Sequence, residues 1–446
     1  MNKLVINRNM LRIAALSVCV CAAGMVSCGS SEEEEVKYDP SRSFWLDSFY
    51  PEKGKYQEKV MLNGENFPND PEAVRVYFNH RRAPVIGSTG MRMYVRAPRL
   101  PGKECVISVV VGADSVTYND VFHYEESMTV TTLAGNGNME EFQEGELASS
   151  VVHPRFLCVD GEGNIFIANR NKDDGGQHLY FMRANEEENV VTRIVSSYLI
   201  ANTPCADPNT GVIWVPTEMT IGSFLTCDPK EFWAPKVREV IWPTGASDRP
   251  TQNGWKHAMV ANPSDGYIYT RWWEGHIGRI HPETYEVEVI AKTPATGSCT
   301  GLTFNPLRPN IMYMAFSSGG FNNGIYSIDV AAADPLSTLT RLNSSIAAGG
   351  HRDGPLATAQ FNGPMQIFCD AEGFMYIAER YNHCIRRISP ENMVETVLGM
   401  PGSPGWHDGT KEEALFNQPY GIGINKEGDV YVGDWGNGRL RKLSIN

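Results

Sequence analysis

The chain is 446 residues long, has a formal net charge of −13 and contains 42 glycines and 27 prolines. This length exceeds what one hydrophobic core usually supports, so we expect more than one domain. The acidic balance argues against nucleic acid as a partner, because phosphate binding requires clustered lysine and arginine. Turn-forming residues spread among short apolar runs predict an all-β architecture.

Residues 1–27 have the pattern of an export signal. A positively charged start precedes an apolar run, residues 13–26, which is too short to span a bilayer and ends in Val-Ser-Cys-Gly. This ending resembles the lipobox of bacterial lipoproteins, which implies that Cys28 is diacylated and anchors the protein in a membrane. An ordinary signal peptide with an incidental cysteine is the alternative.

Residues 28–42 are expected to form a flexible acidic tether. Cys28 is followed by Gly-Ser-Ser and four glutamates, a composition that stays solvated rather than folding. The segment resembles the acidic export signal that sends Bacteroidetes lipoproteins to the outer face of the outer membrane. The resemblance implies a lipid-anchored location on the cell surface of such a bacterium.

Residues 43–126 show short alternating strands separated by Pro, Gly and Asn. Their number and the length of the segment are typical of an immunoglobulin-like sandwich. Tyr50-Pro51, Gly64-Glu-Asn-Phe67 and the closing Phe122-His-Tyr124 resemble the IPT/TIG domain. The resemblance implies a spacer or docking module without catalytic activity, and we expect a spacer.

Residues 127–446 contain an internal repeat. Segments 364–388 and 419–443 align without a gap as strand, Asp/Asn-x-x-Gly turn, strand, polar loop and strand, and they resemble NHL repeats. Degenerate copies with the same outline occupy residues 156–184, 205–242, 257–290 and 301–342. Six four-stranded units that cannot bury their faces alone predict a six-bladed β-propeller.

The last repeat ends at Leu443 and has no outer strand of its own. Residues 129–135 match the outer strand at residues 393–399 of the preceding unit. We therefore expect the early segment to complete the final blade, so that the ring has no free edge. An open solenoid is the alternative, and it would not require this exchange.

Aromatic residues and arginines recur in the loops that alignment of the repeats places on one face. Residues 271–274 align with the polar loops of other units, so both adjacent indoles are expected to project from this face. Flat aromatic rings suit the C–H faces of sugars, and arginines can bind hydroxyls or carboxylates. The expected ligand-binding residues are Trp255, Arg271, Trp272, Trp273, Arg380, Tyr381, Trp406 and Trp435, with Arg170 nearby. The alternative is that these rings pack blade against blade.

Related six-bladed propellers include lactonases and lyases that hold a metal at the pore mouth. The matching positions here are Arg155, His257, Thr300, Met365 and Tyr420. One histidine without a carboxylate is a poor cage for a metal, so we expect neither a metal nor another cofactor. A lyase that uses His257 with Tyr420 or Arg155 as acid and base is the enzymatic alternative.

The favoured interpretation is a surface lipoprotein that captures polysaccharide or oligosaccharide on the aromatic rim of the propeller. The immunoglobulin-like domain would act as a spacer, and an outer-membrane glycan importer is a candidate partner. A third hypothesis is a protein-interaction scaffold, which predicts a broad flat apolar patch rather than aromatics interspersed with arginines.

Overall fold

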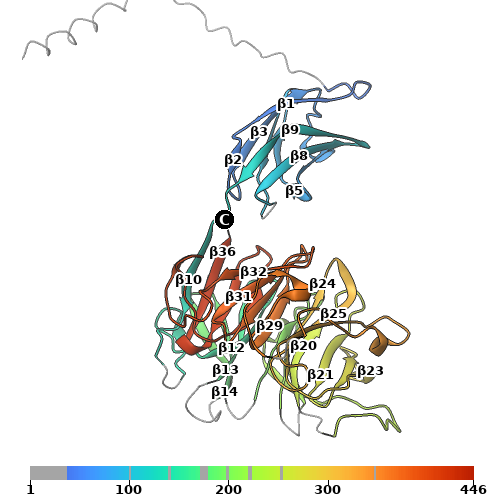
Figure 1. Ribbon diagram of the computed structural model, residues 1–446, viewed down its shortest axis with the longest axis vertical. Coiled ribbons are helices and arrows are strands. Elements are labelled where there is room, and N and C mark those ends of the chain that lie inside the picture. Colours follow the sequence, from blue (N-terminus) through green and yellow to red (C-terminus); the bar gives the residue numbers. More distant parts are fainter. Residues whose placement is uncertain are drawn as a thin grey trace, which may run out of the picture. The chain divides into compact units, whose positions relative to one another are not determined.

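The computed structural model describes residues 38–99, 102–138, 142–170, 179–196, 200–218, 223–251, 255–345 and 348–445 (Figure 1). The chain divides after Tyr124 into two compact units, each described here by itself. The expected signal at residues 1–27, Cys28 and most of the tether lie outside the described residues. Within the described ranges, no helix has the length and apolar character that crossing a membrane requires. The all-β expectation is confirmed, because strands account for nearly all the regular structure.

The first unit consists of two sheets around one core. One sheet has the order β1 (Trp45–Tyr50), β3 (Lys59–Glu65), β7 (Arg92–Arg96) and β6 (Val85–Ser88). The other has the order β2 (Lys53–Gly54), β9 (Asp114–Tyr124), β8 (Glu104–Val111), β4 (Val74–Phe78) and β5 (Arg81–Ala83), and a 3-10 turn at Pro71–Ala73 precedes β4. Alternate residues of β3, such as Val60 and Leu62, are fully buried, as expected for strands with one face on a core.

Part of the expected tether is held against this unit. The side chain of Asn66 accepts a hydrogen bond from Asp39 N at 2.8 Å and donates to Asp39 O at 2.9 Å and Arg42 O at 2.7 Å. Residues 38–42 are therefore ordered by Asn66, and the expectation of a free tether as far as residue 42 is wrong for these five residues.

The second unit contains six sheets in its described part. The six sheets are numbered in the chain order of their inner strands, and the inner strand is named first for each sheet. Sheet 1 consists of β12 (Pro154–Val159), β13 (Ile165–Arg170), β14 (Leu179–Asn185), β15 (Val190–Ser196) and β11 (Gly145–Glu146). Sheet 2 consists of β16 (Cys205–Ala206), β17 (Ile213–Pro216), β18 (Phe224–Cys227) and β19 (Pro235–Arg238), with a 3-10 turn at Pro229–Glu231.

Sheets 3 and 4 continue the series. Sheet 3 consists of β20 (Lys256–Ala261), β21 (Ile268–Trp272), β22 (His276–Ile280) and β23 (Val287–Lys292). Sheet 4 consists of β24 (Cys299–Asn305), β25 (Arg308–Phe316), β26 (Gly324–Asp329) and β27 (Thr340–Arg341), with a 3-10 turn at Pro335–Thr338.

Sheets 5 and 6 correspond to the two clearest repeats. Sheet 5 consists of β29 (Pro364–Cys369), β30 (Met375–Glu379), β31 (Cys384–Ile388), β32 (Met393–Leu398) and β28 (Gly354–Pro355), with a 3-10 turn at Leu356–Thr358. Sheet 6 consists of β34 (Pro419–Ile424), β35 (Val430–Asp434), β36 (Arg439–Ile445), β10 (Met128–Ala134) and β33 (Gly409–Thr410), with a 3-10 turn at Trp435–Asn437.

The inner strand of each sheet contacts the inner strand of the next sheet. β12 contacts β16, and the contacts continue through β20, β24, β29 and β34 back to β12. Glycine permits this close approach. A Cβ atom on Gly421 of β34 would lie 3.0 Å from Arg155 O of β12, and one on Gly301 of β24 would lie 2.6 Å from Met365 O of β29. These inner strands are buried on both faces, which explains why they read as continuous apolar runs.

The strand at the start of the second unit pairs with the last strand of the chain. β10 runs antiparallel to β36, with Met128 opposite Ile445 and Val130 opposite Leu443. On its other side, β10 pairs with β33 through Thr129 and Val130. Sheet 6 is therefore assembled from both ends of this unit, which lie side by side in Figure 1.

Buried ion pairs repeat in sheets 5 and 6. Arg386 Nη1 lies 2.9 Å from Glu379 Oε2, and Arg386 Nη2 lies 2.6 Å from Asp353 Oδ1. Arg441 makes the same pairs with Asp434 at 2.8 Å and Asp408 at 2.6 Å. In both sheets the arginine connects a carboxylate of the segment before the inner strand to a carboxylate at the end of the second strand.

Candidate ligand-binding face

Three arginines gather around the ring of Tyr420 at the start of β34. The guanidinium carbon of Arg380, which follows β30, lies 4.8 Å from the ring centroid, and that of Arg155 on β12 lies 5.5 Å from it. Arg170, the last residue of β13, adds its positive charge to the electrostatic environment of Tyr420. We call Arg155, Arg170 and Arg380 the arginine cluster. Its members come from sheets 1 and 5 and surround Tyr420 of sheet 6.

Arg155 is the most constrained member of the cluster. Burial and the neighbouring positive charge of Arg170 lower the pKa of Arg155 to about 10, so it remains a cation at neutral pH. Its Nη1 atom is buried and, among the described residues, has no hydrogen-bond partner. A guanidinium nitrogen in this state favours an acceptor supplied from outside the chain.

His257 and Glu218 lie beside the cluster. His257 Nε2 is 3.6 Å from Glu218 Oε1, and the same oxygen accepts a hydrogen bond from Asn202 Nδ2 at 2.9 Å. Burial lowers the pKa of His257 to about 4, with Glu218 opposing this effect and the nearby Arg155 adding to it. The imidazole is therefore neutral at pH 7.

The structure brings the three residues of the enzymatic alternative together, but the lowered pKa of His257 makes it a weak general base. A group with a pKa near 4 is a weak base at neutral pH, because general bases work best when their pKa is close to the operating pH. Burial raises the pKa of Tyr420, which keeps its hydroxyl protonated. Among the described residues, no group of three His, Cys, Asp or Glu side chains could hold a metal ion.

Partly exposed aromatic side chains lie against Arg380 and at the end of β20 that carries His257. Tyr381 is 49% exposed, and the guanidinium of Arg380 lies 4.6 Å from its ring centroid. Trp255 is 41% exposed and meets the half-buried Trp273 edge-on, with centroids 5.9 Å apart. Trp255 precedes Lys256 and His257 directly, so this indole pair lies at the same end of β20 as His257.

Trp435 is closer to the core than the sequence indicated. Only 9% of its surface is exposed, its ring lies 5.0 Å from that of Tyr420, and its Nε1 donates to Arg170 O at 2.9 Å. The expectation that this ring faces a ligand is wrong in detail, because the indole instead packs under Tyr420 and holds the end of β13, which carries Arg170.

The expectation that Arg271 and Trp272 project from the rim is wrong. β21 extends through Trp272, and both side chains are buried. Trp272 packs against Trp242 with centroids 5.6 Å apart. Neighbours in a strand point to opposite faces, but sheet 3 is covered on both faces, so both side chains find a core.

Arg271 has a structural role that its position explains. Its Nη1 donates to Gly297 O at 3.0 Å and its Nη2 donates to Thr293 Oγ1 at 2.8 Å, and the guanidinium lies 4.9 Å from the Phe316 ring centroid. The arginine therefore ties the linker that leads to sheet 4, and its donors are occupied.

Trp406 lies apart from the cluster. Its ring is 50% exposed and stacks with Arg439, whose guanidinium carbon is 3.9 Å from the centroid. Its Nε1 donates to Thr132 Oγ1 at 3.1 Å, and Thr132 belongs to β10, away from the inner strand of sheet 6. The aromatic residues expected on one rim are thus divided between the centre and the edge.

Glu218 is the residue near the site that the repeat alignment missed. It follows β17 in the most diverged unit, whose inner strand β16 has only two residues. Because this unit could not be aligned, nothing in the sequence associated Glu218 with His257.

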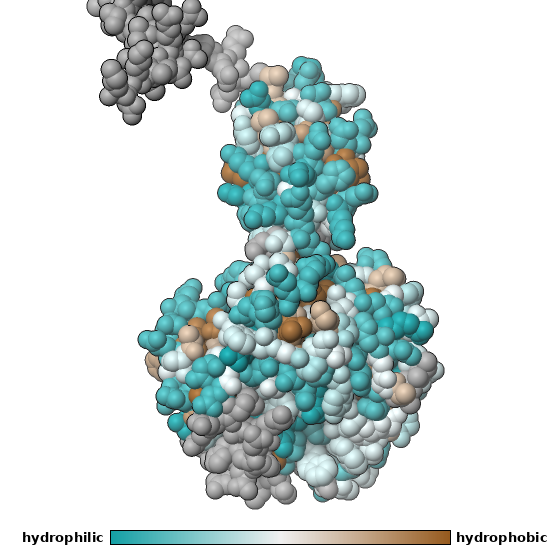
Figure 2. All heavy atoms as spheres, turned by 60° about the vertical axis from the view of Figure 1, so that its left-hand side comes forward, coloured by the Kyte–Doolittle hydropathy of each residue, from teal (hydrophilic) through white to brown (hydrophobic). Residues whose placement is uncertain are grey.

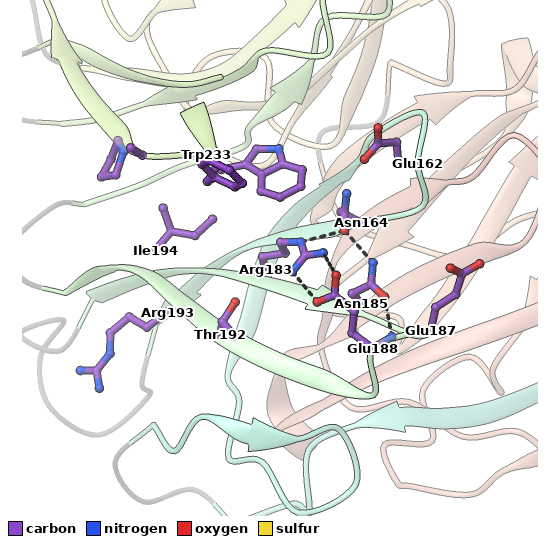
Figure 3. Close-up of a pocket in the computed structure, with 13 residues that line it drawn as sticks. Glu162, Asn164, Arg183, Asn185, Glu187, Glu188, Thr192, Arg193, Ile194 and Trp233 are labelled. Carbon is purple, nitrogen blue, oxygen red and sulfur yellow. Dashed lines mark hydrogen bonds and ion pairs between the residues drawn. The ribbon is translucent and has the colours of Figure 1, made fainter. Parts of the chain in front are cut away.

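Two hollows elsewhere in the second unit have different properties. One, of about 760 Å³, lies beside Arg183 and Trp233 (Figure 3). Arg183 Nη2 pairs with Glu188 Oε1 at 2.6 Å and Arg183 Nε donates to Asn164 Oδ1 at 2.7 Å, so the guanidinium of this hollow is paired within the chain. The other, of about 640 Å³, opens at the opposite ends of the inner strands and includes Met259, Leu302 and Ile367.

Side-chain hydrogen bonds link the inner strands to one another in the region between the second hollow and the arginine cluster. Gln366 Oε1 accepts from Leu157 N at 3.1 Å and Ile422 N at 3.3 Å, and Gln366 Nε2 donates to Leu157 O at 2.5 Å. Thr203 Oγ1 donates to Thr300 O at 2.6 Å. The arginine cluster and the hollow are therefore distinct sites at opposite ends of the inner strands.

Family comparisons identify two modules. Residues 46–124 match the IPT/TIG domain, and residues 416–443 match the NHL repeat. The chain is also 25% identical over 170 residues to the protein SUPPRESSOR OF QUENCHING 1, chloroplastic, of Arabidopsis thaliana. This match covers 36% of the chain and 16% of that protein, so the chain spans only a small part of this curated relative's length.

Solved structures resemble the chain over most of its length. A protein of unknown function from Bacteroides thetaiotaomicron has a TM-score of 0.79 and 23% identity, covering 92% of this chain and 100% of its own. An auxiliary nutrient binding protein from the same species has a TM-score of 0.59 and 21% identity, covering 92% of this chain and 99% of its own. At these identities the likeness establishes a shared fold.

Proposed function

We propose that this protein is a cell-surface lipoprotein that binds glycan at the arginine cluster and the aromatic residues beside it. The observation that carries the proposal is exposed Tyr381 against Arg380, together with the buried, unpaired Arg155 Nη1 and a partly exposed indole pair at the end of β20 that carries His257. Aromatic walls with a few placed polar groups are typical of sites for small ligands and sugars. The shared fold with an auxiliary nutrient binding protein supports a role in nutrient capture.

The proposed framework is a six-bladed propeller closed by β10. The continuous sequence of contacts among the inner strands and the pairing of β10 with β36 support this arrangement. Ring closure would hold residues of distant repeats in one rigid site, which lowers the entropic cost of binding. The IPT/TIG domain would act as a spacer, and an outer-membrane glycan importer would receive the captured ligand.

The location on the cell surface rests on the lipobox-like ending and the acidic segment after Cys28. Substitution of Cys28 by Ala should release the protein from the membrane fraction of its host. Retention of the variant in that fraction would contradict the lipid anchor. Loss of the wild-type protein after external protease treatment of whole cells would support the outer face.

The protein-interaction hypothesis has less support than glycan binding. On the face that Figure 2 shows, hydrophilic residues predominate and hydrophobic residues occur in small separate groups. The described residues on that face form no broad apolar patch, which this hypothesis predicts.

Binding of purified protein to a panel of neutral and acidic polysaccharides tests the proposed function. The Trp255→Ala/Trp273→Ala variant should bind at least about tenfold more weakly, because truncating tryptophans that contact a ligand typically costs more than about 1 kcal/mol each. Trp45→Ala is the matched control, since Trp45 is 67% exposed and lies in the first unit. Equal affinity of the double variant and wild type would contradict the proposed site.

A further inference from the structure

The electrostatic environment of the site is opposite in sign to that of the whole chain. The chain carries a net charge of −13, yet Arg155 is surrounded by Arg170 and Arg380, with Glu218 as the acidic group acting on it. Glu218 already accepts from Asn202 and lies beside His257. Among the described residues, the cluster therefore retains uncompensated positive charge in a partly buried position, where charge is costly.

Hydrogen-bonding capacity is also unused in the cluster. Arg155 Nη1 is buried without an acceptor in the described part of the chain. Arg380 Nε donates to Gln418 Oε1 at 3.1 Å, and this bond does not use the two terminal nitrogens of the guanidinium. The guanidinium groups are held by Tyr420 and Gln418, so they are positioned before any ligand arrives.

Other buried arginines of the second unit have partners within the chain, although single nitrogens of Arg341, Arg387 and Arg439 are also buried without a hydrogen bond among the described residues. Arg386 and Arg441 each contact two carboxylates, and Arg271 donates to a hydroxyl and to main-chain carbonyls. Burying a cation is tolerated when it is paired and hydrogen-bonded. Arg155 differs in its surroundings, because it lies among two further cations and, in the described part of the chain, only the carboxylate of Glu218, which is beside His257, acts on it. This difference indicates that its partner is a ligand.

We propose that the arginine cluster binds the anionic oxygens of an acidic saccharide, with a sugar ring against Tyr381. This inference rests on the proposed function and specifies its substrate class. A carboxylate or a sulfate ester offers two coplanar or adjacent oxygens to the guanidinium fork, a charge-assisted geometry stronger than neutral hydrogen bonds. Uronic acids and sulfated sugars both supply this chemistry, and the experiment separates them.

The test uses pairs of ligands that differ only in charge. Binding of the purified protein is measured by calorimetry to oligogalacturonate and its methyl ester, and to dextran sulfate and unmodified dextran. The expected result is that one charged ligand binds at least about tenfold more tightly than its neutral counterpart and that raising the salt concentration weakens this binding. The pair in which the charged ligand binds more tightly than its neutral counterpart identifies carboxylate or sulfate as the recognised group.

Arg380→Gln and Arg155→Gln should each reduce affinity for the charged ligand about tenfold or more and reduce affinity for its neutral counterpart by a smaller factor. Arg279→Gln is the matched control, because Arg279 also stacks on a tyrosine, Tyr267 at 4.9 Å, but pairs with Glu288 at 2.7 Å. Thermal unfolding checks each variant. If Arg155→Gln unfolds, Arg380→Gln alone decides, because Arg380 lies beyond the end of β30.

Failure of the inference is distinguishable from failure of the proposed function. Equal binding of charged and neutral ligands, with no effect of Arg380→Gln, would overturn the acidic-saccharide inference and leave glycan binding intact. Absence of binding to all saccharides would overturn both. Tighter binding of a charged ligand that Arg380→Gln does not weaken would also overturn the inference, since it would place the anion elsewhere.

Discussion

The indole of Trp255 meets the indole of Trp273 edge-on, with ring centroids 5.9 Å apart and the ring planes at 87°. The main chain reinforces this contact, because Trp273 N donates to Trp255 O at 2.9 Å. Trp272, the next residue along the chain, has no exposed surface. Two adjacent tryptophans therefore have different roles, one at the surface beside the site and the other in the core.

The two tryptophans should respond differently to substitution. Trp272→Ala should lower the free energy of unfolding by about 3–5 kcal/mol, because it removes a buried indole and leaves a cavity. Trp255→Ala should change it by about 1 kcal/mol or less, since its ring is partly exposed and loses one aromatic contact. Urea denaturation measures both. Similar losses in the two variants would contradict the burial described here.

The buried ion pairs of sheet 6 should be essential for stability. Arg441→Met leaves the carboxylate of Asp434 buried without its cation, and such losses cost about 3–5 kcal/mol. Arg279→Met breaks the more exposed pair with Glu288 and should cost about 1 kcal/mol or less. Chemical denaturation of both variants checks this contrast. A loss in Arg441→Met no larger than in Arg279→Met would contradict it.

β10 should contribute strongly to the stability of the second unit. Val130 lies between β33 and β36, so proline there removes an amide N–H from a strand paired on both sides. Val130→Pro should lower the melting temperature more than Val130→Ala, which removes side-chain contacts but keeps the N–H. Equal melting temperatures for the two variants would show that the pairing of β10 contributes little.

His257 should make stability dependent on pH. Its pKa is lowered from 6.5 to about 4 on folding, so below pH 6.5 the unfolded chain binds a proton that the folded protein excludes. The free energy of unfolding should therefore fall as pH decreases from 6.5 to 4, by up to about 3 kcal/mol.

His257→Gln provides the comparison for this effect. Urea denaturation between pH 7 and pH 4 should show a smaller loss of stability in the variant than in the wild type, because glutamine does not titrate. Parallel curves for the two proteins would mean that His257 is not buried in its neutral form.

The sequence was sufficient to predict the strands and turns of the repeats. The Asp/Asn-x-x-Gly turns recur, and their glycines, such as Gly373 and Gly428, have φ values of 88° and 84°, which side chains with a Cβ rarely adopt. The match between residues 129–135 and 393–399 also anticipated a strand at β10. These features depend on local conformation and on repetition along the chain.

The sequence alone therefore determined an all-β chain with repeated strand units, and it was sufficient to predict most of the side chains near the starts of the inner strands. Only the tertiary structure decided which of them face solvent. Trp272 and Arg271 became core residues because neighbouring sheets cover both faces of β21, whereas Arg155, Arg170 and Arg380 came together around Tyr420. Burial and charge at a point depend on what the neighbouring sheets supply there, and those neighbours are distant in sequence.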